Sequence, residues 1–289
     1  MGIIVNDPCQ NSMDMLTTRC SRWLKEKHNI LKPVFIDDKS YFLNGFPAED
    51  IIDIVFFGSH LEKVLRSGNW NNRNYRCWVL SQSVKNMFTE VYGFGAEQVS
   101  VIPRYELFPI QNKFRRKINK QDKYSLVYSG RISPIKNIEL LIFTYYFFIQ
   151  QLKSVPPLYL IGPFDSEVLP GDKKRNGNYK ECLIELINIL NLDKNIIILK
   201  EMNPDQWIDH KKFINPILIN FSTFLHEDFG VSVAQAQQHN WPIIYSEWGG
   251  HIDLMGDKLM PIPFELFENC HAHLILGYAY RLSQYCRKN

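Results

Sequence analysis

After residue 124, short apolar runs alternate with helical patterns, and this alternation constrains the fold more than any other feature. The apolar runs predict strands at 125–128, 158–161, 196–199, 217–221 and 242–245. Helical patterns lie near 137–152, 178–191, 204–213 and 229–239. Strands joined by helices form parallel sheets, because a parallel pair needs a long crossover. We therefore predict a doubly wound α/β sheet, with ligand contacts at the carboxyl ends of its strands.

The first hundred residues follow the same pattern in a shorter form. Strands are predicted at 2–6, 33–36, 53–57, 76–80 and 99–102, and helices at 13–27 and near 82–92. The polar, basic segment NKFRRKINKQDK at 112–123 has no apolar period and predicts a solvated connector. The chain should therefore hold two α/β domains facing a cleft: residues 1–108, a linker at 109–123, and residues 124–271.

Composition narrows the class of protein. Of 289 residues, 45% are hydrophobic and 22% are charged, as in globular proteins with a packed core. The formal net charge of +3 and the lack of a nucleic-acid-binding motif argue against nucleic acid as a partner. Six cysteines without a Cys-x-x-Cys pair, and a start without a signal-peptide pattern, fit free thiols in the cytosol. The apolar run at 138–152 is shorter than the ~20 residues of a spanning helix. We expect a cytoplasmic protein.

The segment YSGRISPIKN at 128–137 lies between a predicted strand and a predicted helix. Gly130 allows a tight turn, and the cations Arg131 and Lys136 could hold an anionic group such as a diphosphate. From these residues alone, two ordinary surface cations beside a turn are an equally good interpretation.

A second segment, HEDFGVSVAQAQQ at 226–238, opens a predicted helix. The helix N-terminus at Phe229-Gly230 presents backbone N–H groups at its positive dipole end, which favours an anion there. Glu227 could accept hydrogen bonds from ligand hydroxyls, or it could cap the helix together with Asp228. Gln235 could face the same ligand, or it could be a simple helix residue.

Combined, these segments resemble the nucleotide-sugar-dependent glycosyltransferases of family 4, which have the GT-B fold of two Rossmann-like domains. The matching residues are Gly130-Arg131, Lys136, Glu227, Phe229-Gly230, Gln235, Pro242 and Gly249-Gly250. The resemblance extends to LYLIGPF at 158–164 and to residues 79–104, and it is weak before residue 79.

The resemblance implies a role for each matching residue. Arg131 and Lys136 would hold the donor diphosphate, Glu227 would contact the transferred sugar, and backbone groups at Phe229-Gly230 would complete the sugar-phosphate site. A second glutamate of the family binds the ribose hydroxyls, and Gln235 stands in its place. An amide can still accept and donate hydrogen bonds, but it lacks the strength that charge gives.

The other implied residues are less specific. The expected donor-binding set also contains Gly130, Gly162, Met202, Asp228 and Val231, with Met202 where the nucleotide base is often held. His60 is the nearest candidate for the first-domain histidine of the family, although its register is about two residues off and a structural role is the alternative. The first domain resembles a shortened version of the family's, and a C-terminal helix at 272–289 would pack back on it.

The implied activity is retaining transfer of a sugar from a nucleotide-diphosphate sugar to a glycan, lipid-linked or protein-linked acceptor, as in surface polysaccharide or glycan synthesis. The chain lacks the Asp-x-Asp motif of metal-dependent transferases, so we expect neither a metal nor a cofactor. Peripheral membrane association stays open. Two alternatives also stay open: an inactive glycosyltransferase-like binding or scaffold subunit, and a GT-B-fold nucleotide-sugar epimerase.

Overall fold

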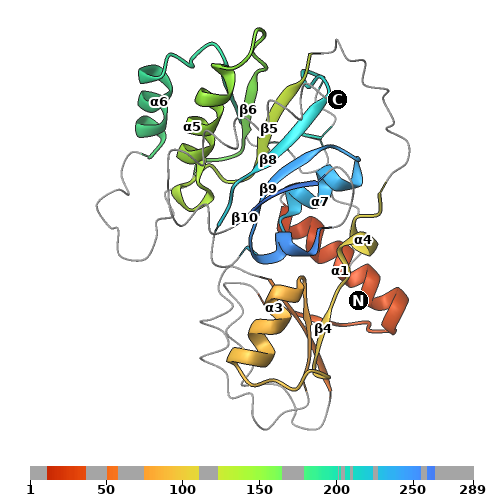
Figure 1. The fold of residues 1–289 in the computed structure, drawn as a ribbon. Helices are drawn as coiled ribbons and strands as arrows, with labels where there is room; N and C mark the ends of the chain where they lie inside the picture. Colours follow the sequence, from red (N-terminus) through yellow and green to blue (C-terminus); the bar gives the residue numbers. More distant parts are fainter. Residues whose placement is uncertain are drawn as a thin grey trace. The chain divides into compact units, whose positions relative to one another are not determined.

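The chain forms two compact units, each built around a parallel sheet (Figure 1). Unit 1 comprises Met1–Ile110, Leu225–Ala234 and Gly249–Met255, and unit 2 comprises Gln111–Phe224, Gln235–Trp248 and Gly256–Asn289. The computed structural model describes residues 12–36, 51–57, 75–110, 123–164, 179–200, 202, 206–208, 211–223, 227–254 and 259–263. The expected strand at 2–6, most of the linker, His60 and the helix at 272–289 lie outside these ranges. The predicted domain limits stay predictions.

Unit 1 contains a four-stranded sheet in the order β1-β2-β3-β4, with every pair parallel. The strands are β1 (Val34–Ile36), β2 (Ile52–Phe56), β3 (Tyr75–Val79) and β4 (Val99–Val101). They confirm the strands predicted at 33–36, 53–57, 76–80 and 99–102, and each end differs from the prediction by at most one or two residues. Because successive side chains point to opposite faces, each strand contributes to two cores. Val55 packs with α1 (Ser12–His28), whereas Ile54 and Phe56 pack beside α3 (Gln82–Asn86).

The helix predicted near 82–92 is present and changes form along its length. Ser81 caps α3 by accepting a hydrogen bond from the Val84 amide at 3.3 Å. A π-helical turn, η2 (Met87–Val91), continues it. Its Phe88 is fully buried against Phe56, with ring centroids 4.8 Å apart. The short helix α4 (Arg104–Leu107) then follows Pro103, whose fixed φ suits the start of a helix.

Unit 2 contains a six-stranded parallel sheet in the order β10-β9-β8-β5-β6-β7. Its strands are β5 (Ser125–Ser129), β6 (Leu158–Ile161), β7 (Ile196–Leu199), β8 (Pro216–Asn220), β9 (Ile243–Glu247) and β10 (Leu259–Pro263). The five predicted strands are confirmed, and β10 was not predicted. Pro261 and Pro263 argue against a strand in the middle of a sheet, but β10 lies at the edge, where prolines are tolerated.

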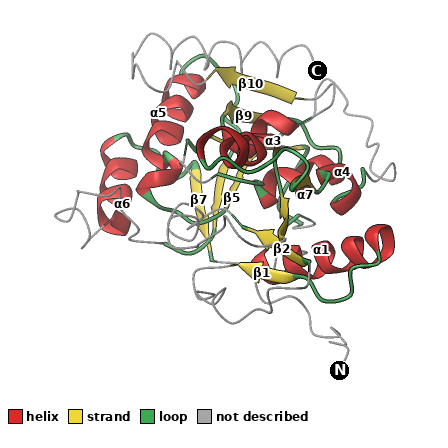
Figure 2. Ribbon diagram, turned by 90° about the horizontal axis from the view of Figure 1, so that it is seen from below, coloured by secondary structure: helices red, strands yellow, loops and turns green. Residues whose placement is uncertain are grey.

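Two helices cover the core of unit 2, and Figures 1 and 2 show them side by side. They are α5 (Ile138–Ile149), which follows the 3₁₀ turn η4 (Pro134–Lys136), and α6 (Tyr179–Ile189). Tyr179 joins them by donating a hydrogen bond to the Glu139 carboxylate at 2.9 Å. No helix within the described ranges is long and apolar enough to cross a bilayer.

One helix prediction is wrong and another is shifted. Residues 206–208, 211 and 212 form turns and bends, and residue 213 is irregular, instead of the helix predicted at 204–213. Trp207 and Ile208 are buried, but Lys211 and Lys212 stand where a helix would need its next apolar residues. The helix predicted at 229–239 is α7 (Val231–Gln238), and the division between the two units falls inside it.

Candidate functional site

Two glycines shape the carboxyl ends of β5 and β6. Gly130 and Gly162 have φ angles of +152° and +143°, which side-chain-bearing residues rarely adopt. A Cβ atom on Gly162 would overlap the Gly130 carbonyl oxygen. The Gly130 amide donates to the Ile161 carbonyl at 2.9 Å, and the Ile132 amide donates to the Pro163 carbonyl at 2.8 Å. The chain around residue 131 is therefore fixed by backbone pairing beyond the end of the sheet.

Lys136 and Asn137 tie the segment after β5 to the segment after β8. The Lys136 Nζ atom lies 3.2 Å from the Ser222 hydroxyl. Asn137, in the left-handed conformation at φ 53°, donates to the Phe221 carbonyl at 2.9 Å and to the Thr223 hydroxyl at 2.8 Å. These contacts hold the lysine at the carboxyl end of a central strand, where ligand contacts were predicted.

The other predicted residues of unit 2 lie at the same edge of the sheet. Arg131 is partly buried, and its carbonyl accepts a hydrogen bond from the Tyr128 hydroxyl at 2.7 Å. Met202 is partly buried and follows β7. The structure thus places Gly130, Arg131, Lys136, Gly162 and Met202 after the carboxyl ends of β5, β6 and β7.

The predicted residues 227–231 belong to unit 1, where two of their side chains point inward. Asp228 is 6% exposed, and the Ser81 hydroxyl donates to its Oδ1 atom at 3.1 Å. Phe229 is 3% exposed and packs against Phe108, with ring centroids 5.4 Å apart. Glu227 and Val231 are partly buried. Any ligand contact by Asp228 or Phe229 would therefore come from the backbone.

The surroundings of Asp228 favour the neutral form of its carboxyl group. Burial raises the pKa of its carboxyl group to about 7, and the carboxylates of Glu227 and Asp253 add to this increase. The hydrogen bond from Ser81 and the positive charge of Arg104 lower the pKa in part. The loop that carries Glu227 thus contains a buried acid that titrates near neutral pH.

Three glycines allow two loops of unit 1 to approach each other closely. A Cβ atom on Gly249 or Gly250 would overlap the carbonyl oxygen of Glu227 or of Asp228, respectively. A Cβ atom on Gly230 would come within 2.7 Å of His251 Nε2. The Gly-Gly pair in the sequence is therefore explained by contact with the loop that carries Glu227.

Gln235 lies on α7, on its unit 2 side. Only 3% of its surface is exposed. Its Oε1 atom accepts a hydrogen bond from the Trp207 indole at 3.0 Å. The Trp207 ring in turn packs edge-on against Trp241, with ring centroids 5.5 Å apart. The amide of Gln235 is therefore held by Trp207, whose ring is packed in turn against Trp241 inside unit 2.

Residues 110–259, more than half of the chain, match the sequence model of the family described as glycosyl transferases group 1. The match includes β5 to β9 and the residues of both candidate segments. The chain belongs to the group 1 glycosyl transferases. Among curated proteins, no sequence matches it.

Solved structures with a similar fold share little sequence with this group 1 glycosyl transferase. WaaG, a glycosyltransferase involved in lipopolysaccharide biosynthesis, has a TM-score of 0.54 at 13% identity, with 98% of this chain and 93% of that chain covered. Anabaena HepE in complex with UDP has a TM-score of 0.51 at 15% identity, with coverages of 96% and 72%. The lipopolysaccharide outer core galactosyltransferase WaaB scores 0.50 at 16% identity, with coverages of 93% and 72%. The predicted GT-B fold with two Rossmann-like parallel sheets is confirmed.

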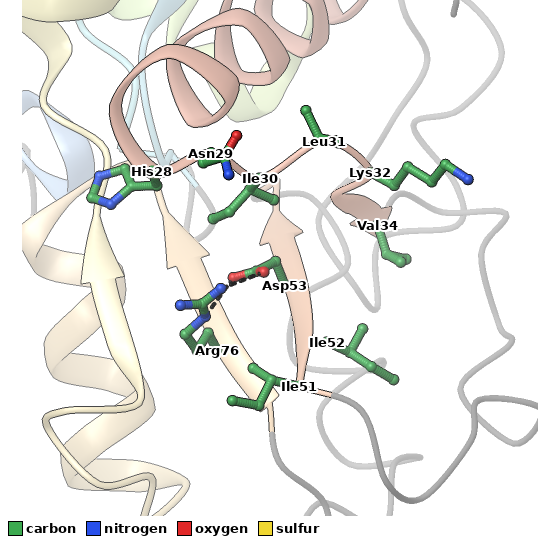
Figure 3. A pocket seen from close by; sticks show the side chains of 10 residues that line it. All are labelled: His28, Asn29, Ile30, Leu31, Lys32, Val34, Ile51, Ile52, Asp53 and Arg76. Atoms are coloured by element: carbon green, nitrogen blue, oxygen red, sulfur yellow. Dashed lines mark hydrogen bonds and ion pairs between the residues drawn. The ribbon is translucent and has the colours of Figure 1, made fainter. Parts of the chain in front are cut away.

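A cavity of about 530 Å³ in this glycosyl transferase contains none of the predicted site residues (Figure 3). It lies at the amino ends of β1, β2 and β3, whereas ligands of parallel sheets bind at the carboxyl ends. On its wall, the Arg76 guanidinium donates two hydrogen bonds to the Asp53 carboxylate, each at 2.7 Å. Trp78 donates a third to the same carboxylate at 2.9 Å. The pair is thus already satisfied by its own neighbours.

Sequence reasoning missed two residues that hold the 227–230 loop of this glycosyl transferase, Ser81 and Arg104. Ser81 lies two residues after the end of β3, and Arg104 lies three residues after the end of β4. Arg104 was a weak signal, because a single arginine after an apolar strand is usually exposed, whereas this one is 5% exposed. Their partners lie more than 120 residues away, at Asp228 and Phe229.

Proposed function

We propose that this group 1 glycosyl transferase is a family 4 enzyme that transfers a sugar from a nucleotide-diphosphate sugar with retention of anomeric configuration. The observation that carries the proposal is the position of Arg131 and Lys136 at the carboxyl edge of the unit 2 sheet, held by Tyr128 and Ser222. A guanidinium and an ammonium beside ordered backbone provide charge and hydrogen bonds for a diphosphate.

The proposed chemistry needs no protein nucleophile. The bond between the anomeric carbon and the donor phosphate oxygen breaks, and the acceptor hydroxyl oxygen bonds to the same face of that carbon. The leaving diphosphate takes up the hydroxyl proton. Arg131, Lys136 and the N–H groups at Phe229-Gly230 would stabilise the charge that grows on the diphosphate, which is commonly the largest contribution to catalysis. On this proposal no metal and no cofactor take part.

Three further residues would contact other parts of the donor. Glu227 would accept hydrogen bonds from hydroxyls of the transferred sugar, Gln235 would contact the ribose, and Met202 would lie near the base. The UDP complex of HepE supports a uridine nucleotide as the first to test. The proposed acceptor is a glycan, a lipid-linked or a protein-linked group, and the lipopolysaccharide roles of WaaG and WaaB favour testing glycan and lipid-linked acceptors first. We also propose that the enzyme acts in the cytoplasm, at or near the membrane surface.

A nucleotide screen tests this proposal. Thermal shift with UDP, GDP, ADP and their sugar conjugates should identify a donor that stabilises the wild type, and Arg131→Ala and Glu227→Ala should weaken binding or transfer. Arg22→Ala, at an exposed position of α1, is the matched control for the loss of an arginine. The site assignment fails if no nucleotide stabilises the wild type, or if both variants bind and transfer like the wild type.

Gln235 favours a second candidate, an inactive glycosyltransferase-like subunit that binds a nucleotide without turning it over. Its amide stands in the place of the ribose-binding glutamate and is engaged by Trp207. The purified protein would then bind UDP but neither transfer nor hydrolyse the sugar of any donor. Turnover by the purified chain without a partner eliminates this candidate.

A further inference from the structure

Arg104, the first residue of α4, joins two backbone segments inside unit 1. It is 5% exposed, and its Nη2 atom donates hydrogen bonds to the carbonyls of Phe229 and Gly250, each at 2.5 Å. Its guanidinium carbon lies 4.8 Å from the centroid of the Phe229 ring. A guanidinium suits this position because its planar N–H donors have fixed directions and its face stacks on aromatic rings.

The segments that contain Phe229 and Gly250 are also hydrogen-bonded to each other. The Gly250 amide donates to the Glu227 carbonyl at 2.8 Å, and a Cβ atom on Gly250 would overlap the Asp228 carbonyl oxygen. The Gly230 carbonyl accepts the first hydrogen bond of α7, from the Ala234 amide at 2.9 Å. Arg104 therefore clamps the loop that carries Glu227 at the point where α7 begins.

We propose that Arg104 is a positioning residue of the donor site, an inference that rests on the proposed function. On this inference Arg104 acts on the donor only through the Phe229 and Gly250 carbonyls. By fixing them it sets the place of the Glu227 side chain and the direction of the N–H groups at Phe229-Gly230. Such groups stabilise a transition state only when they are held in place beforehand, and a displacement of about 1 Å can cost roughly 100-fold in rate.

The neighbouring carboxyl group decides how the inference is tested. Asp228 is buried beside Arg104, and among the described residues its Oδ2 atom has no hydrogen-bond partner. Removal of Arg104 alone would leave this acid without a nearby positive charge, and a buried uncompensated charge is strongly destabilising. Loss of activity could then reflect unfolding. The background Asp228→Asn removes the charge and keeps the shape of the side chain.

The experiment compares the double variant Arg104→Gln/Asp228→Asn with Asp228→Asn, and Arg104→Lys with the wild type. The assay is turnover of the donor selected from UDP-glucose, UDP-galactose and GDP-mannose. Loss of Arg104 should lower kcat by about 10- to 100-fold, while the Kd of UDP should rise by less than about threefold, because on the proposed function Arg131 and Lys136 supply most of its charged contacts. Hydrogen exchange should become faster at the amides of 227–231. Arg104→Lys should recover part of kcat, because an ammonium can donate to the same carbonyls but cannot stack as a plane.

A matched control exists in the same unit. The Arg19 Nη1 atom donates to the Leu107 carbonyl at 2.8 Å, and its guanidinium lies 4.0 Å from the centroid of the Phe108 ring. Arg19→Gln should lower thermal stability but leave kcat within about twofold.

Two results would overturn the role of Arg104 and leave the proposed function standing. One is an equal kcat for the double variant and Asp228→Asn, and the other is a lower kcat without faster exchange at 227–231. If the wild type neither binds nor turns over any nucleotide sugar of the panel, the proposed function fails and the inference fails with it.

Discussion

The Trp207 indole donates a hydrogen bond to Gln235 Oε1 at 3.0 Å, between two side chains that are each 3% exposed. This contact shows how unit 2 accommodates an amide where the resemblance implies a ribose-binding carboxylate. A glutamate at the same position could accept the indole N–H, but its charge would be buried. The pair therefore links protein stability to the proposed nucleotide contact.

Gln235→Glu tests this link. We expect the free energy of unfolding to fall by about 1–3 kcal/mol at pH 8, because a carboxylate is buried. Binding of UDP should tighten by several-fold, because a carboxylate forms charge-assisted hydrogen bonds with ribose hydroxyls. Denaturant unfolding and isothermal titration measure the two effects. Gln238→Glu, at a buried glutamine of the same helix, should lower stability without tightening UDP binding. An unchanged Kd for Gln235→Glu would contradict the ribose role.

On the proposed function, Gly162→Ala should disturb the donor site through the backbone. The new methyl group would overlap the Gly130 carbonyl oxygen, so the chain that carries Arg131 must shift. We expect a loss of roughly 2–4 kcal/mol of stability and at least tenfold weaker UDP binding. Gly93→Ala is the control, since Gly93 also has a positive φ, of 72°, but nothing within 4 Å of its added Cβ. Similar effects of both substitutions would show that φ strain alone, and not the overlap, is responsible.

Lys136→Met removes a charge and keeps much of the apolar stem. On the proposed function, UDP should bind at least about tenfold more weakly, because one of two cations that hold the diphosphate is lost. The dependence of Kd on salt should also become shallower. Titrations at 50 mM and 300 mM NaCl measure both changes. Lys153→Met, at an exposed lysine beyond α5, should change neither. Wild-type UDP affinity in Lys136→Met would remove this lysine from the site.

Asp228→Asn should make stability less dependent on pH. The pKa of this carboxyl group is raised from 3.8 in its ordinary environment to about 7, chiefly by burial. Between these values the folded protein keeps a proton that the unfolded chain has released, so wild-type stability falls as pH rises from about 4 to about 7. The variant lacks this titration and should gain about 1–3 kcal/mol over the wild type between pH 5 and pH 8.

Urea unfolding at several pH values measures the difference between Asp228→Asn and the wild type. The charged or acidic neighbours of Asp228 are Arg104, Glu227, Asp253 and the thiol of Cys20. None of them is changed by the substitution. Asp53→Asn, which removes the charge of an acid paired with Arg76 in the same unit, is the control for the substitution itself. A difference that is constant with pH would show that Asp228 does not titrate in this window.

Local pattern was sufficient for most of the fold. The apolar runs at 158–161 and 196–199 coincide with β6 and β7. For the other predicted strands that lie within the described residues, the predicted ends differ from the observed ends by at most two residues. These runs can be recognised as strands from the sequence because a parallel strand is buried on both faces and is therefore apolar along its length. The pattern failed at 204–213 and at β10, where burial is set by neighbours distant in sequence and not by a local period.

The candidate site was also predicted in part from local sequence pattern, and the rest of it depends on the tertiary structure. Glycines, cations and the helix start lie next to one another in two short segments, so the sequence by itself determined Gly130, Arg131, Lys136 and the loop at 227–230 as candidates. Only the tertiary structure decided that Asp228 and Phe229 point inward, that Arg104 clamps their loop, and that Trp207 holds Gln235. The physical reason is that these hydrogen bonds join residues 28 to 147 positions apart, and side-chain direction and burial at such contacts depend on packing that no local pattern encodes.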